Sequence, residues 1–151
     1  MLFLHSHCPC SSATVNEVAR IIAHTNGRLS VHAEFVRPQG EDDRWTGTSL
    51  YRNAAAIPGV IAEIDAEGVE AARFAAETSG QSMLYDTSGE LVFSGGITLA
   101  RGHEGDNPGE TAIVDFVNGF GSATPRTPVF GCALSNRLPV ELVGKETACR
   151  N

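Results

Sequence analysis

The chain has 151 residues, 42% of them hydrophobic and 19% charged, and its formal net charge is −7. This length suits one globular domain with its own core. The negative charge and the scattered arginines argue against nucleic acid or an anionic membrane surface as the main partner. The longest mainly apolar stretch, 54–62, is broken by proline and glycine and is far shorter than the roughly 20 residues of a membrane helix. We therefore expect no membrane contact by this segment.

Residues 1–5 form an apolar run that predicts a buried strand already under way at the first residue, without a signal peptide before it. We therefore expect an N-terminal segment to be missing from this sequence. Residues 14–24 follow with an apolar helical face. Thr14 and Glu17 have the spacing of a capping box, although Ser11 and Ser12 are alternative helix starts.

The middle of the chain continues to alternate between strands and helices. Residues 29–35 have the period-2 pattern of a half-exposed strand, and 38–48 form a polar, charged loop. We expect a short helix over 49–56 that is stopped by proline and glycine, a strand over 60–64, and a helix over 68–78. The strands 82–85 and 90–93 are joined by turn residues and predict a hairpin.

The last part of the domain begins with a Gly-rich loop, 95–106. Asn107 as N-cap, Pro108 at the first helical position and Glu110 at the third predict a helix to residue 118. A long surface connection follows from 119. Residues 137–151 form a tail that holds one short strand at 140–143 or no fixed structure. The expected organisation is one domain over 1–136 and a C-terminal tail over 137–151.

Four cysteines, at positions 8, 10, 132 and 149, allow three fully paired connectivities, and spacing does not choose among them. A domain of this size folds without disulfides, so we interpret Cys8 and Cys10 as chemical groups. They lie where the first helix begins, and the helix dipole and free N–H groups there stabilise a thiolate. A charged imidazole from His5 or His7 would lower the thiol pKa further.

Four segments carry a family resemblance: His-Cys-Pro-Cys-Ser at 7–11, and residues 85–97, 101–107 and 127–132. In this order of elements, the chain resembles RedB-like thioredoxin-fold proteins, within the TlpA-like and peroxiredoxin-like branch. The resemblance implies an α/β, thioredoxin-like three-layer fold with a helix–strand insertion after the second strand. It also implies a thiol or redox role outside the cytoplasm, in the periplasm or on a membrane anchor that this sequence lacks.

The sequence departs from the thioredoxin pattern in two places. Thioredoxins carry C-x-x-C, whereas this chain has C-x-C, so either Cys8 stands first with Ser11 second, or Cys10 stands second with His7 first. Gly80 or Gln81 stands where the family has a cis-proline. That loop presents the substrate backbone and keeps metals off the thiols in the family, so its change puts ordinary disulfide exchange in doubt.

Three hypotheses follow for the function. In the first, the protein is a thiol–disulfide oxidoreductase acting on a protein thiol or disulfide: Cys8 attacks, Cys10 resolves the mixed disulfide, and Cys132 is a second resolver. It needs no cofactor. In the second, the chain binds Cu(I) or Zn(II), because soft thiolates beside imidazoles suit these ions, through Cys8, Cys10 and one of His5, His7, His103 or Cys132. The third is a thioredoxin-like scaffold without chemistry.

The first two hypotheses share a geometric expectation. The second strand of the hairpin returns to the edge where the cysteines lie, so His103 in the following loop should come close to them. Cys132 follows the apolar residues 129–130, which need a place to be buried. We expect both side chains within about 10 Å of the Cys8–Cys10 pair, the outer reach of groups that share one site. Cys149 is expected to be incidental.

Overall fold

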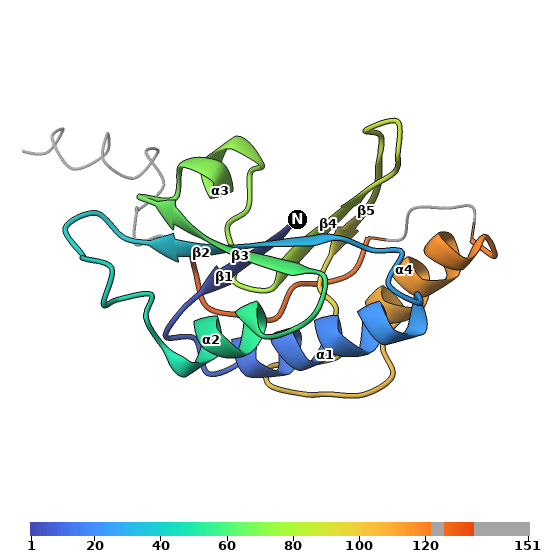
Figure 1. Cartoon of the computed structure of the whole chain (residues 1–151), viewed down its shortest axis with the longest axis horizontal. Coiled ribbons are helices and arrows are strands. Elements are labelled where there is room, and N and C mark those ends of the chain that lie inside the picture. Colours follow the sequence, from blue (N-terminus) through green and yellow to red (C-terminus); the bar gives the residue numbers. More distant parts are fainter. Residues whose placement is uncertain (122–125, 135–151) are drawn as a thin grey trace, which may run out of the picture.

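The computed structural model describes residues 1–121 and 126–134. A mixed sheet with the strand order β3-β2-β1-β4-β5 forms its centre, and helices lie on both faces (Figure 1). Strands β1 to β3 are parallel, while β4 and β5 run antiparallel to their neighbours. The elements are β1 (Leu2–His5), α1 (Ser11–His24), β2 (Val31–Arg37), α2 (Ser49–Ala55), β3 (Val60–Ala66), α3 (Val69–Arg73), β4 (Gln81–Tyr85), β5 (Leu91–Gly95) and α4 (Pro108–Asn118). The α/β class is confirmed.

The larger core lies between the sheet and the helices α1, α2 and α4, which share one face (Figure 1). The apolar face expected for the first helix supplies Val15, Val18 and Ile22, and Ile21 joins them. Phe35 is fully buried in the middle of the sheet. The alternation of β2 therefore places its odd-numbered residues in this core and its even-numbered residues on the other face.

A smaller cluster covers the opposite face under α3, with Phe3, Val36, Ala71, Ala76, Met83 and Leu134 as buried members. Asp65 accepts the backbone N–H groups of Glu70 and Ala71 and so caps α3. The helix expected over 68–78 is shorter, because Ala75 takes a left-handed conformation with φ of 51° soon after its end. This face of the sheet therefore has much less helical cover than the other.

The first helix begins at Ser11, so the expected capping box of Thr14 and Glu17 is wrong and the earlier start is confirmed. Thr14 is almost completely buried, one and a half turns away from an exposed N-cap position. Glu17 is fully buried and accepts the backbone N–H of Gly105 at 2.7 Å. Its carboxylate holds the Gly-rich loop against α1, because a buried loop needs partners for its backbone groups.

The second predicted N-cap is confirmed. The Asn107 side chain accepts the N–H of Glu110 at 2.8 Å, and its amide donates to the carbonyl of Gly105 at 3.0 Å. Because Asn107 is 4% exposed, water cannot replace these bonds. We expect Asn107→Ala to lower the free energy of unfolding by about 1–2 kcal/mol in urea titrations. Asn53→Ala, at an exposed position in α2, is the matched control, and an equal loss there would contradict the capping role.

The C-terminal part of the description ends at residue 134. The predicted strand at 140–143, the tail 137–151 and Cys149 lie outside the described residues. Residues 126–134, orange to red in Figure 1, run back along the molecule toward the end where β1 meets α1. Among the helices of the described part, none is long and apolar enough to cross a bilayer.

Candidate functional site

Cys8 and Cys10 lie in two consecutive tight turns between β1 and α1. The Cys8 N–H donates to the carbonyl of His5, and the Ser11 N–H donates to the carbonyl of Cys8, both at 3.0 Å. Cys10 is the N-cap residue of α1 and is partly exposed, and its side chain makes no capping hydrogen bond. Cys8 is 3% exposed. The thiol that follows the strand is therefore the buried member of the pair.

The segment 131–134 covers Cys8 by pairing with the residues that lead into β4. The Ser79 N–H donates to the carbonyl of Cys132 at 2.8 Å, and the Leu134 N–H donates to the carbonyl of Glu77 at 2.9 Å. Thr78 and Ala133 form an antiparallel bridge between these bonds. This backbone pairing places Cys132 beside Cys8, and the cysteines at 8, 10 and 132 are all free thiols.

The two adjacent thiols shift each other's pKa in opposite directions. Burial raises the pKa of Cys8, but hydrogen bonds from the Cys132 thiol, the Ser11 hydroxyl and the N–H groups of Cys132 and Cys10 outweigh it and lower the pKa from 9.0 to about 7. The hydrogen bond to Cys8, burial and the nearby sulfur charges raise the pKa of Cys132 to about 11. At neutral pH this arrangement favours a Cys8 thiolate that accepts a proton from the Cys132 thiol.

Two buried serines hold the turn around Cys8. The Ser79 hydroxyl accepts the N–H of His5 at 2.8 Å and shares a second 2.8 Å hydrogen bond with the hydroxyl of Ser11. Both residues are 1% exposed. Ser79 joins the end of β1, the beginning of α1 and, through its backbone N–H, the segment 131–134. The sequence gave no sign of this role, because nothing distinguishes Ser79 from the other serines before the fold is known.

His5, His7 and Trp45 form an aromatic cluster beside the thiol turn. The Trp45 ring centre lies 4.3 Å from that of His7 and 5.8 Å from that of His5. The His7 Nε2 donates to the carbonyl of Trp45 at 3.0 Å, and the His7 N–H donates to His5 Nδ1 at 3.1 Å. Burial and the neighbouring His7 lower the pKa of His5. The hydrogen bonds listed above, rather than an imidazolium charge, account for the low pKa of Cys8.

Trp45 is the residue of this cluster that the sequence analysis missed. The loop 38–48 was interpreted as a solvated charged connection, yet its tryptophan packs on both histidines. The indole Nε1 is buried, and no described residue accepts a hydrogen bond from it. The lone tryptophan of the chain within a charged loop was the available signal, since such a side chain needs apolar contact.

His103 is exposed in the Gly-rich loop. In the part of the chain described, its side chain has no hydrogen-bond partner, and it is not among the groups that shift either thiol. Arg101 is the loop residue whose charge reaches the site, where it lowers the pKa of Cys132 against the stronger raising effects. The role of His103 as a base or ligand remains a prediction.

The cysteine-based metal site also remains a prediction. Over residues 1–121 and 126–134, a group of three ligand side chains whose atoms all lie within 4.8 Å of one another occurs at His32, Glu34 and Glu63. These residues lie on β2 and β3. The thiols with His5 or His7 do not form such a group within the same residues.

Comparison with family models and with curated protein sequences finds no match. Two solved structures are similar. A hypothetical protein from Sinorhizobium meliloti 1021 aligns with a TM-score of 0.65 and 22% identity over 88% of this chain and 76% of its own. An uncharacterized conserved protein from Geobacillus kaustophilus aligns with a TM-score of 0.70 and 17% identity over 90% of this chain and 75% of its own. At these identities the comparison shows a shared fold.

Proposed function

We propose that the chain is a thioredoxin-like thiol–disulfide oxidoreductase in which Cys8 is the nucleophile and Cys132 its resolving partner. The observation that carries the proposal is the Cys8 thiol with a pKa of about 7, hydrogen-bonded to a second thiol. The strand order, the parallel β1–β2 pair and the antiparallel β4–β5 pair support the fold. So does the position of Cys8 between β1 and α1.

The reaction exchanges two electrons between this dithiol and a partner's disulfide. The Cys8 thiolate attacks one sulfur of the partner, forms a mixed disulfide and releases the other sulfur as a thiolate, which takes a proton. The Cys132 thiolate then attacks the Cys8 sulfur, forms the Cys8–Cys132 disulfide and releases the second partner thiolate. The partner is reduced and this chain is oxidised; the reverse sequence oxidises a partner dithiol.

The pKa of Cys132 fits this order of events. Its thiol is held protonated mainly by its hydrogen bond to Cys8. When Cys8 enters a mixed disulfide it loses its charge, so the interaction that raises the pKa of Cys132 disappears while the charge of Arg101 remains. Cys132 then loses its proton more easily at the moment when a second nucleophile is needed.

Cys132 is a better placed resolver than Cys10. A disulfide between residues separated by one position closes a small ring and departs from relaxed geometry. Cys132 approaches from a different segment and already interacts with the Cys8 sulfur through both its thiol and its N–H. The sequence analysis named Cys10 first and Cys132 second, and we propose the opposite ranking.

The pairing of 131–134 with 77–79 also bears on substrate access. The resemblance implies that the loop before β4 presents the substrate backbone, and here the chain's own segment pairs with that loop. Because Cys8 is 3% exposed, a partner has to displace this segment before its sulfur can reach the thiolate. The segment therefore acts as an internal substitute for a bound peptide.

Disulfide mapping after oxidation with glutathione disulfide tests the proposal. The Cys10→Ser variant should still form the Cys8–Cys132 disulfide, and the Cys132→Ser variant should accumulate glutathione on Cys8, because its resolver is missing. Accumulation in Cys10→Ser instead would identify Cys10 as the resolver. If Cys8 reacts no faster than Cys149 at pH 7, the oxidoreductase function is wrong.

A further inference from the structure

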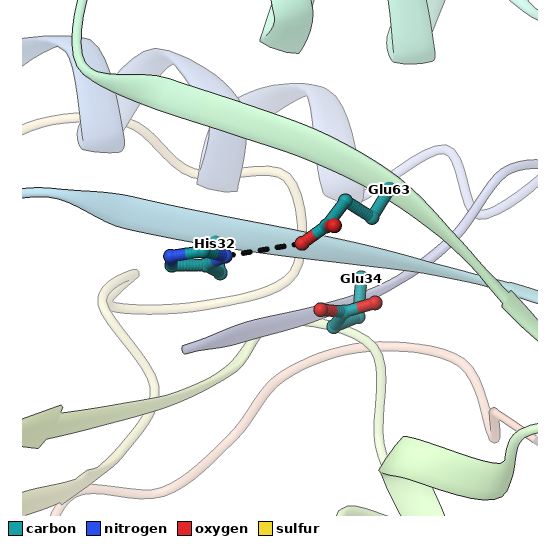
Figure 2. Close-up of side chains that lie close together, drawn as sticks. All are labelled: His32, Glu34 and Glu63. Atoms are coloured by element: carbon teal, nitrogen blue, oxygen red, sulfur yellow. Dashed lines mark hydrogen bonds and ion pairs between the residues drawn. The ribbon is translucent and has the colours of Figure 1, made fainter.

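A second group of reactive side chains lies on the sparsely covered face of the sheet, on β2 and β3. His32 and Glu34 are two residues apart on β2 and therefore point to the same face (Figure 2). Glu63 on β3 pairs directly with Glu34 in the strand register. One ligand atom from each of the three lies within 4.8 Å of the others, and His32 Nδ1 is 3.0 Å from Glu63 Oε2.

Glu34 is the member of this group that needs explanation. It is 6% exposed, and its carboxylate has no hydrogen bond or ion pair with any described residue. Burial and the charges of Glu63, Asp65 and Glu70 raise its pKa, while His32 lowers it. Two carboxylates directly opposite on paired strands repel each other, and a buried carboxyl without a partner costs free energy. The position calls for a cation.

The other charged groups nearby have partners of their own. Asp65 accepts two backbone N–H groups of α3, and the Glu70 carboxylate pairs with Arg73 at 2.7 Å. The amino group of Met1 donates to the carbonyl of Met83 at 2.8 Å, and burial lowers its pKa against the attraction of Glu34. None of these described groups contacts the Glu34 carboxylate.

We propose that His32, Glu34 and Glu63 bind a divalent transition-metal ion. Imidazole nitrogen and carboxylate oxygens are ligands that Zn²⁺ and its neighbours in the first transition series accept at about 2.0–2.2 Å. Ligand atoms around one such ion are about 3–3.5 Å apart, close to the His32–Glu63 distance. The side chains of His32 and Glu63 are about half exposed and can turn toward Glu34, and water completes the coordination.

This site is separate from the thiols and does not rest on the proposed redox function. Its ligands belong to β2 and β3, whereas the thiols lie between β1 and α1 and in 131–134. The ligand chemistry also differs, because oxygen and imidazole replace soft sulfur. A cation at this position would neutralise the two opposed carboxylates and stabilise the pairing of β2 with β3.

Titration of the reduced full chain with Co²⁺ tests the proposal, since this paramagnetic ion broadens nearby amide signals in NMR spectra. We expect about one site per chain, broadening of the amides of residues 32–34 and 62–64, and displacement by Zn²⁺. Glu34→Gln keeps the size of the side chain and removes one of two repelling charges, so the variant should fold. Its Co²⁺ affinity should fall by about tenfold or more.

The matched control is Glu90→Gln, an exposed carboxylate in the hairpin turn, which should leave the affinity unchanged. Retained affinity in Glu34→Gln would overturn the proposal and leave Glu34 as a buried protonated carboxyl. Broadening confined to residues 7–11 would also overturn it, because the ion would then belong to the thiols. Thermal unfolding of the two variants without metal checks that the comparison concerns binding.

Discussion

Replacing Cys132 with valine should raise the thiol pKa of Cys8 from about 7 by one unit or more, toward the ordinary 9.0. Valine keeps the apolar cover that raises the pKa by burial, but it removes the thiol that donates to the Cys8 sulfur. The bonds from Ser11 and from backbone N–H groups remain, so the pKa should not pass far beyond its ordinary value. The thiolate fraction at pH 7 should fall from about one half to about a tenth or less.

Alkylation of Cys8 with iodoacetamide between pH 5 and 9, followed by mass spectrometry, measures this shift. The midpoint of the rate profile reports the pKa and does not depend on how exposed the sulfur is. Cys132→Ser is the control, because its hydroxyl can still donate and should keep the midpoint near 7. A midpoint near 7 in Cys132→Val would mean that the helix N-terminus alone lowers the pKa.

The comparison also separates two explanations for the same low pKa. From the sequence, the helix dipole and the histidines were the expected causes, because both can be inferred from residues that precede and follow Cys8. In the structure the main lowering contributions come from Cys132 and Ser11, with His5 and His7 absent from the causes. Sequence reasoning therefore predicted the direction of the shift for a different physical reason.

Local signals predicted most of the fold. The hairpin of β4 and β5, the Asn107 cap and the position of Cys8 and Cys10 at a strand-to-helix turn each depend on a few neighbouring residues. The first helix begins earlier than its apparent capping box, because Glu17 is used instead by the distant backbone of Gly105. A partner 88 residues away leaves no trace in the local pattern.

The site itself could be predicted only in part. Cys132 was expected near Cys8 because residues 129–130 need burial, but backbone pairing with 77–79 is what positions it. Such pairing does not depend on a side-chain pattern, so only Gly131 marks it. The alternation in 29–35 correctly separated two faces of the strand, yet it could not show that Glu34 is buried, since that depends on how the sheet face is covered.

Replacing Gly131 with alanine should release the segment 131–134 from the sheet. A Cβ at this position would lie 1.9 Å from the carbonyl oxygen of Ser79, which is backbone and cannot turn aside. Ser79 is also fixed by its bonds to His5 and Ser11. The alanine chain therefore relieves the clash by moving the segment, and Cys132 moves with it. We expect the Cys8–Cys132 disulfide to form at least about tenfold more slowly, because the effective concentration of the second thiol falls.

Two measurements distinguish local release from general unfolding in Gly131→Ala. The N–H groups of Ser79 and Leu134 are bonded across this pairing, so their hydrogen exchange should speed up, while exchange of Ile21 in the core of α1 should stay slow. Alkylation of Cys8 should also accelerate at pH 9, where the thiol is ionised in either form and exposure limits the rate. Gly47→Ala is the control, since its added Cβ would meet the nearest atom at an ordinary 3.5 Å. If Gly131→Ala closes the disulfide as fast as this control, the segment does not position Cys132, and the resolving role returns to Cys10.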